Sequence, residues 1–360
     1  MSLFDVDTID TPLSELKKSI IKNRIPINAN IFITNKCNFK CLHCYVQSQK
    51  NQDDGALSVN QWKEILNILK NKGCLSITFS GGEVLSSLKF LEIYEYAYSM
   101  NFKISIITNL SLLNKKHIEI FSQKRPVCII VSLYGGSNDT YKKFCGINNG
   151  WDLVSHNIVK LNKYNINIQI QTVLNTINFS ELKQMKEFAE LNSISFFAFR
   201  NITCETDGNI RPLQYQISPH QEIESFEIMK DVPAFLQSIR KNADMWTSGY
   251  KLCFAGLTNC YIDCQGNLFL CNHSSNDKYS ILDYGFDEAW RNILKIRKSE
   301  IEVKNECGDC KNKEFCGRCS PTFVKMKQGI GYPFPDCKNI YIIKNYLMKR
   351  VNQNENYEQL

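Results

Sequence analysis

Six short apolar runs, each followed by a helical pattern, limit what this chain can fold into. The runs lie at residues 30–34, 75–79, 103–108, 127–133, 166–170 and 194–199. In the first intervening segment, Ser58 and Gln61 form a capping box ahead of a helix. Strands that alternate with helices predict a parallel sheet covered by outer helices. Six units are fewer than the eight of a closed barrel, so we expect an α/β fold with a partial (β/α)6 barrel.

Polar and metal-binding residues follow several of these runs. Active sites of such barrels gather where the carboxyl ends of the strands meet the loops. The residues at these positions are Cys37, Cys41, Cys44, the turn 80–83, Asn109, Ser132 and Asn175. The sequence therefore predicts one site at this rim.

The first run leads into three cysteines, Cys37, Cys41 and Cys44, spaced C-x3-C-x2-C. Three thiolates in one loop can hold a metal centre. They are one ligand short of a closed zinc site or a fully protein-ligated iron–sulfur cubane. A [4Fe–4S] cluster held in this way keeps one iron free to bind something else. The alternatives are a zinc site or three unrelated cysteines.

This loop resembles the signature of the radical S-adenosylmethionine (SAM) enzymes. The resemblance implies that the free iron binds the amino and carboxylate groups of SAM. An electron from the cluster then yields methionine and a 5′-deoxyadenosyl radical. That family often has an aromatic residue before the third cysteine, where this chain has His43.

The resemblance also implies residues that contact SAM. The turn Gly81-Gly82-Glu83 resembles a motif that receives the SAM amino group, because glycines admit a close ligand and a carboxylate accepts from ammonium. The other candidate SAM-binding residues are Tyr45 beside adenine, and Asn109, Ser132 and Asn175 at strand ends. The alternatives are an ordinary turn, strand-end caps and a half-buried aromatic.

Composition narrows the class of protein further. The chain has 360 residues, 16 of them cysteine, and its first ten residues carry no Lys or Arg. Because no secretory signal and no apolar run of membrane-spanning length is present, we expect a cytoplasmic enzyme whose cysteines serve metal or redox chemistry. The net charge of +7 fits a solvated surface, with an acidic peptide partner as a weaker alternative. We expect no nucleic acid and no membrane partner.

The remaining candidate metal ligands lie in the last third of the chain. They are Cys253, Cys260, Cys264, Cys271, Cys307, Cys310, Cys316, Cys319 and Cys337. A hairpin is expected over residues 261–270, with its turn at 263–266. This region resembles the SPASM domain, which implies two auxiliary iron–sulfur clusters. The departure is that only Gly317 and Arg318 separate the last two cysteines of the central run, where the family has three residues.

The resemblance implies one auxiliary set of Cys307, Cys310, Cys316 and Cys337, and another of Cys253, Cys271 and Cys319. A cubane has four irons, so the second set lacks one ligand. Cys260 or Cys264 could complete it, or its free iron could bind a substrate thiolate. Two zinc sites are the alternative to two clusters.

The expected domains are an N-terminal extension (1–27), the partial barrel (28–216), a helical linker (217–244), the SPASM domain (245–340) and a C-terminal helix and tail (341–360). In the linker, Ser218, Pro219 and Gln221 form a helix start.

By resemblance, the chain is expected to be a peptide-modifying radical SAM/SPASM enzyme that forms a thioether or carbon–carbon crosslink. Its partners would be a peptide substrate and an external electron donor. Because only 36 residues precede Cys37, leader recognition would use a separate leader-binding protein or another surface of the chain. Three alternatives stay open: formylglycine formation of the sulfatase-maturing type, a non-peptide small-molecule substrate, and a non-catalytic iron–sulfur carrier or scaffold.

Overall fold

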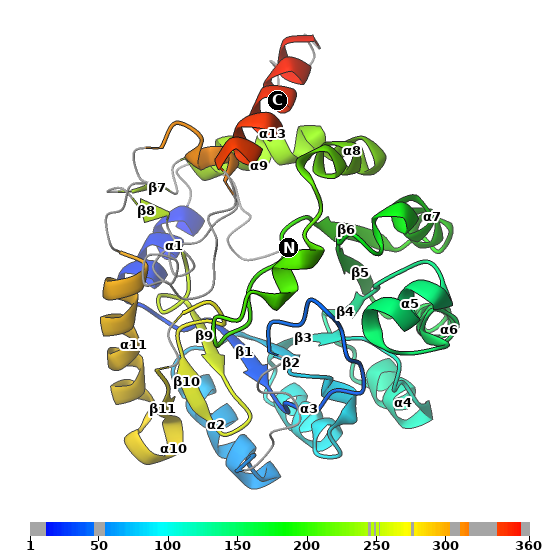
Figure 1. The fold of residues 1–360 in the computed structure, drawn as a ribbon. Coiled ribbons are helices and arrows are strands. Elements are labelled where there is room, and N and C mark those ends of the chain that lie inside the picture. The colour runs from blue at the N-terminus through cyan, green and yellow to red at the C-terminus, as the bar shows by residue number, and fades with distance from the viewer. Residues whose placement is uncertain are drawn as a thin grey trace.

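The computed structural model describes residues 12–46, 55–243, 246–247, 250–251, 253–274, 277–302, 310–316 and 337–353. Its main feature is one sheet with the strand order β11-β10-β9-β1-β2-β3-β4-β5-β6, curved into an open arc (Figure 1). The first six strands are β1 (Asn28–Phe32), β2 (Ser76–Ser80), β3 (Lys103–Thr108), β4 (Cys128–Ser132), β5 (Ile168–Val173) and β6 (Ser195–Phe199). Neighbours among these six pair in parallel. The predicted partial barrel is confirmed.

Helices cover the outside of this arc (Figure 1). They are α2 (Val59–Asn71), α3 (Phe90–Ser99), α4 (Lys115–Gln123), α5 (Asn138–Cys145), α6 (Gly150–Asn162) and α7 (Leu182–Leu191), with α1 (Pro12–Lys22) ahead of β1. The predicted capping box at Ser58 is present: the Ser58 hydroxyl accepts from Gln61 N, and the Gln61 side chain accepts from Ser58 N. Two helices, α5 and α6, connect β4 to β5, where the sequence analysis expects a single helical pattern.

The core lies between the strands and these helices. Ile31, Phe79 and Ile106 are fully buried on their strands, and Trp62 and Leu66 of α2 pack in the same cluster. Burial of each such side chain contributes about 1.5–3 kcal/mol. Alternation of buried and partly exposed residues along β1 to β5 leaves a second face toward the barrel interior. This rigid frame fixes where each strand ends, and so positions the rim.

The C-terminal third extends the same sheet. Strand β9 (Asn259–Ile262) pairs in parallel with β1, although the two lie far apart in the sequence. Strands β10 (Asn267–Phe269) and β11 (Tyr279–Ser280) then continue the sheet antiparallel. The predicted hairpin is confirmed: its turn is closed by a bond from Gly266 N to Asp263 O of 3.0 Å. The sheet therefore contains strands from both sides of the expected domain boundary between residues 244 and 245.

The rest of the described chain forms further helices, short 3-10 turns and a separate two-stranded sheet. They are η2 (Val84–Ser86), η3 (Phe179–Glu181), η4 (Arg211–Tyr215), α8 (Pro219–Met229), α9 (Val232–Ala243), β7 (Trp246–Thr247), β8 (Tyr250–Lys251), α10 (Ile281–Tyr284), α11 (Phe286–Glu300), η5 (Lys313–Phe315) and α13 (Cys337–Gln353). The expected helix start at Ser218 is confirmed at α8. Phe226, Val232, Ile343 and Leu347 pack α13 onto α8 and α9. Within the described residues, no helix has the length and apolar character needed to span a bilayer.

Candidate functional site

A cavity of about 440 Å³ opens at the carboxyl ends of the barrel strands. Cys37, Cys41 and Cys44 all line it. The strands or the residues just after them contribute the rest of the wall: Gly81 and Gly82 after β2, Asn109 after β3, Ser132 in β4, Gln171 in β5 and Phe199 in β6. The structure therefore gathers most of the predicted rim residues around the cysteine loop.

The cysteine loop forms main-chain hydrogen bonds to the C-terminal end of α5. Lys40 N donates to Cys145 O at 2.8 Å, and Leu42 N donates to Phe144 O at 3.0 Å. His43 stacks on Phe144 with ring centroids 4.9 Å apart. Burial lowers the pKa of His43 to about 4, so the ring is neutral and serves packing. These contacts fix the loop that carries the three thiols.

The two glycines after β2 allow one backbone segment to approach another. A Cβ atom on Gly81 would lie 2.3 Å from the Thr34 carbonyl oxygen, and one on Gly82 would lie 2.4 Å from that of Lys36. Gly82 N donates to Thr34 O, and Glu83 N donates to Lys36 O, both at 2.7 Å. The turn therefore clamps the chain just before Cys37, and any larger residue would push this segment away.

The side chain of Glu83 points into the protein. It is 1% exposed, and its carboxylate accepts from Thr108 Oγ1 at 2.6 Å, Asn109 N at 2.7 Å and Leu85 N at 3.0 Å. Burial raises the pKa of Glu83, and the three hydrogen bonds oppose that rise. The carboxylate thus joins the end of β3 to the turn after β2. Oε2 accepts only one of these bonds, so a contact with the SAM ammonium stays a prediction.

The other predicted SAM-binding residues divide into two groups. Tyr45, Asn109 and Ser132 line the cavity. Asn109 is fixed there by its side-chain bonds to Asn38 and Ser111. Asn175 is fully buried and is absent from the cavity wall, because its Oδ1 accepts from the main chain of the turn that follows β5.

The three thiols line one cavity and suit an iron–sulfur cluster by their chemistry. In the described part of the chain, no three His, Cys, Asp or Glu side chains stand close enough together to hold one metal ion. In an iron–sulfur cluster each thiolate binds a different iron, so the ligands are spread more widely than around one ion. Three soft thiolates that line one cavity could hold such a cluster with one iron left free.

Residues that the sequence analysis missed face the same cavity. Asn272 and His273 come from the C-terminal third, directly after Cys271, and Asn201 and Thr203 follow β6. Asn272 Nδ2 donates to the Tyr45 hydroxyl at 3.2 Å, which joins the two halves of the chain across the mouth. Burial raises the pKa of Tyr45 to about 12, so its phenol keeps its proton at neutral pH. In the sequence, the four missed residues were marked only by their position next to a candidate ligand or a strand end.

The C-terminal cysteines occupy different faces of the sheet. The ring of Tyr261 contacts that of Phe269, and Phe269 and Cys271 line one small cavity, which places Cys271 on the Tyr261 side of the sheet. Cys260 precedes Tyr261 in β9, so its side chain points to the opposite side. It is fully buried in the core, and burial beside Cys74 raises its pKa well above the ordinary value. This placement is that of a core residue, as is that of Cys264, which is 1% exposed.

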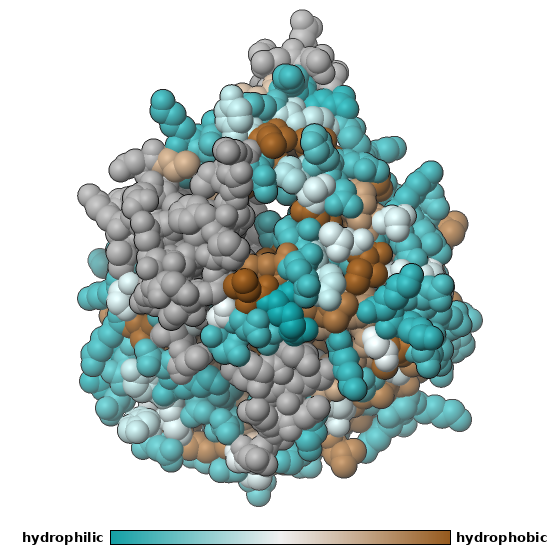
Figure 2. Space-filling view, viewed as in Figure 1, coloured by the Kyte–Doolittle hydropathy of each residue, from teal (hydrophilic) through white to brown (hydrophobic). Residues whose placement is uncertain are grey.

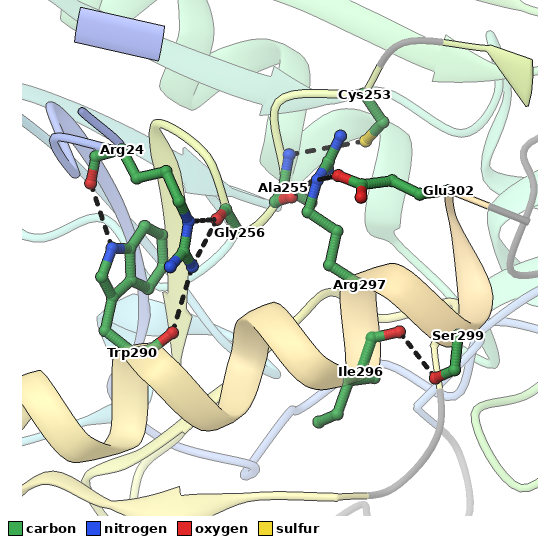
Figure 3. A network of polar contacts seen from close by, with 9 residues as sticks. All are labelled: Arg24, Cys253, Ala255, Gly256, Trp290, Ile296, Arg297, Ser299 and Glu302. Carbon is green, nitrogen blue, oxygen red and sulfur yellow. Dashed lines mark hydrogen bonds and ion pairs between the residues drawn. The ribbon is translucent and has the colours of Figure 1, made fainter. Parts of the chain in front are cut away.

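Two arginines form hydrogen bonds to the loop that carries Cys253 (Figure 3). Arg297 is 1% exposed; its Nη1 donates to Ala255 O at 2.5 Å, and its Nε donates to Glu302 at 2.9 Å. Arg24 donates to Gly256 O at 2.8 Å and lies over the Trp290 ring. Ala255 N in turn donates to Cys253 Sγ at 3.5 Å. The two guanidinium groups therefore fix the backbone of residues 255 and 256, close to this thiol in the sequence.

The last cysteines are described only in part. Cys310 and Cys316 flank η5, and Asn312 N donates to Cys310 Sγ at 3.4 Å. Cys307 and Cys319 lie outside the described residues, and so does the side chain of Cys337. The two expected auxiliary ligand sets therefore stay predictions.

Comparison with known proteins gives the following similarities. Residues 31–189 match the profile of the radical SAM superfamily. The AdoMet-dependent heme synthase of Methanosarcina barkeri is 24% identical over 80% of this chain and 89% of its own length. The mycofactocin maturase MftC of Mycobacterium tuberculosis is 23% identical over 87% of this chain and 83% of its own. The crystal structure of Streptococcus suis SuiB bound to the precursor peptide SuiA has a TM-score of 0.70 at 19% identity, over 94% of this chain and 84% of that one.

Proposed function

The chain is a radical SAM enzyme, and from that premise we propose that it modifies a peptide substrate by abstracting hydrogen from it. The observation that carries the proposal is the cavity at the strand ends, where three cysteines from one loop meet the polar ends of β3 and β4. When bound by Cys37, Cys41 and Cys44, a [4Fe–4S] cluster supplies the electron that cleaves SAM to methionine and a 5′-deoxyadenosyl radical.

The protein's own residues would bind and orient SAM. We assign polar contacts to Asn109 and Ser132, and an aromatic contact to Tyr45, because all three face the cavity. Gly81 and Gly82 line the cavity while their backbone clamps the cysteine loop. Glu83 supports this arrangement from behind, and its contact with the SAM amino group remains part of the proposal, as does a role for Asn175.

We further propose a SPASM-type region with two auxiliary clusters. Cys253, Cys271 and Cys319 would hold one, and Cys307, Cys310, Cys316 and Cys337 the other. We leave Cys260 out of the first set because its side chain is fully buried in the hydrophobic core. Such clusters would take up the electron that remains after hydrogen abstraction, or would bind a substrate group.

A peptide substrate is supported by the likeness to a mycofactocin maturase over most of both chains. The product would be a thioether or a carbon–carbon crosslink, and the reaction would use an external electron donor and a separate leader-binding protein. The heme synthase relative favours a second candidate, a non-peptide small molecule.

The test is anaerobic reconstitution followed by reaction with SAM and dithionite. The proposal expects 5′-deoxyadenosine in the absence of any peptide. With a short cysteine-containing peptide encoded beside this chain, mass spectrometry should show a product two mass units lighter for each crosslink. Formation of 5′-deoxyadenosine with conversion of a porphyrin but of no peptide would favour the second candidate. Absence of SAM cleavage would reject both.

A further inference from the structure

The open edge of the barrel sheet is strand β6. It pairs with β5 on one side, and the strand order ends there. Leu174 N donates to Phe199 O at 2.8 Å, so the main-chain groups of Phe199, and by alternation those of Phe197, face β5. Those of Phe196 and Ala198 therefore face outward. Among the described residues, none forms a hydrogen bond to these outward groups.

Further along the same edge, the outward main-chain groups of Arg200 and Ile202 bond to a side chain. The Gln216 side chain donates from Nε2 to Arg200 O at 2.6 Å and accepts at Oε1 from Ile202 N at 2.7 Å. In a parallel sheet, a residue donates its N–H to one residue of the neighbouring strand and accepts at its C=O from the residue two further on. The Gln216 side-chain amide makes the same pair of bonds, to Arg200 and Ile202. The edge of β6 thus has the geometry to pair with another strand. Gln216 occupies only the positions at Arg200 and Ile202, beyond the end of β6.

The strand is firmly seated on its other sides. Phe196 and Ala198 pack against Leu174, Leu182 and Ile217 on the outer side of the sheet. Phe197 and Phe199 face the barrel interior and are 48% and 51% exposed. Figure 2 shows hydrophobic surface, in brown, around the centre of this face, in the part of the view where Figure 1 places β6. Exposed aromatics on an open edge strand favour pairing with another chain.

The edge leads directly to the chemistry. Phe199 lines the cavity that contains Cys37, Cys41 and Cys44, and Asn201 and Thr203 continue that wall. A peptide paired with β6 would therefore run along the strand toward the strand ends and deliver its next residues to the cavity.

We propose that an extended segment of the substrate peptide binds as an added strand on the outer edge of β6. Its main chain pairs with Phe196 and Ala198, and alternate apolar side chains cover Phe197 and Phe199. The main-chain bonds give affinity for many sequences, and the two aromatic rings select apolar residues at every second position. This inference depends on the proposal that the substrate is a peptide.

The key variant is Ala198→Pro. Proline removes the outward N–H of residue 198 and places its ring on the pairing edge, and an edge strand tolerates proline where the N–H faces solvent. Ala198→Ser is the matched control, because it keeps the N–H at similar side-chain volume. The probes are octapeptides with blocked ends, selected from a random library against the reconstituted wild-type enzyme with SAM.

The inference expects the selected peptides to carry apolar residues at alternate positions and to bind Ala198→Pro about tenfold more weakly or worse. Ala198→Ser should bind within about twofold of the wild type. N-methylation of alternate peptide residues should abolish binding to the wild type, which gives the same answer without any protein variant. The inference would be overturned if Ala198→Pro bound the peptides as tightly as the wild type and the wild type bound the N-methylated peptides as tightly as the unmodified ones. A selection that yields no peptide would also overturn it. Peptide-independent SAM cleavage should persist in Ala198→Pro; its absence from the wild type would instead refute the proposed function.

Discussion

The substitution Glu83→Gln distinguishes a structural carboxylate from a ligand-binding one. In the structure, Oε1 accepts from Leu85 N and Thr108 Oγ1, and Oε2 accepts from Asn109 N. A glutamine amide has only one oxygen. Whichever way the amide is turned, one of the two backbone N–H groups, that of Leu85 or that of Asn109, loses its acceptor.

The magnitude follows from these contacts. A buried N–H left without an acceptor costs about 1–3 kcal/mol, and the remaining bonds lose their charge assistance. Removal of a buried charge offsets part of this cost, since burial raises the pKa of Glu83. We therefore expect the free energy of unfolding of the metal-free protein to fall by about 2 kcal/mol.

The assay is anaerobic urea unfolding of the metal-free protein, followed by SAM binding to the reconstituted enzyme. Glu92→Gln is the matched control, because that carboxylate is 61% exposed in a surface pair with Lys63 and should change stability by less than about 0.5 kcal/mol. Glu83→Gln should weaken SAM binding as well, because the turn that clamps the cysteine loop is loosened. If the variant loses SAM affinity but unfolds at the wild-type urea concentration or above, Glu83 acts on SAM alone and our structural reasoning is refuted.

Two further predictions use the same purified protein. Cys260→Ala should leave the iron content after anaerobic reconstitution unchanged, whereas Cys253→Ala should lower it; a loss of iron in Cys260→Ala would show that Cys260 is a ligand after all. Burial raises the pKa of Glu222 to about 7, above that of an unfolded chain, so the folded protein holds this proton more tightly. The free energy of unfolding should therefore decrease as the pH rises from about 4.5 to about 7 and then level off, and Glu222→Gln should remove that part of the slope. An unchanged slope in Glu222→Gln would contradict the assignment.

The barrel could be predicted because its signals are local. Each strand is a short buried run, and helix starts such as Ser58 carry their own capping residues. Helix α5 was missed although its signals were present: Ser137 caps it, and Gly146 ends it with a left-handed backbone. Its eight residues are too few for a clear helical period.

The addition of β9 to β1 could not be predicted, because the pairing joins distant segments and neither strand specifies its partner. The same limit explains Cys260. The alternation Asn259-Cys260-Tyr261-Ile262 indicates a strand, but only the fold shows that Cys260 lies on the core face of that strand. Two of the three partners of Glu83, Thr108 and Asn109, likewise lie at the end of β3, which the Gly-Gly-Glu pattern does not contain.

The central claim is that Cys37, Cys41 and Cys44 hold the centre that cleaves SAM. The most direct measurement is 5′-deoxyadenosine formation by the reconstituted triple variant Cys37→Ala, Cys41→Ala and Cys44→Ala with SAM and dithionite. The account predicts no 5′-deoxyadenosine, while iron bound by the C-terminal cysteines remains. Cleavage of SAM at the wild-type rate by this variant would contradict it.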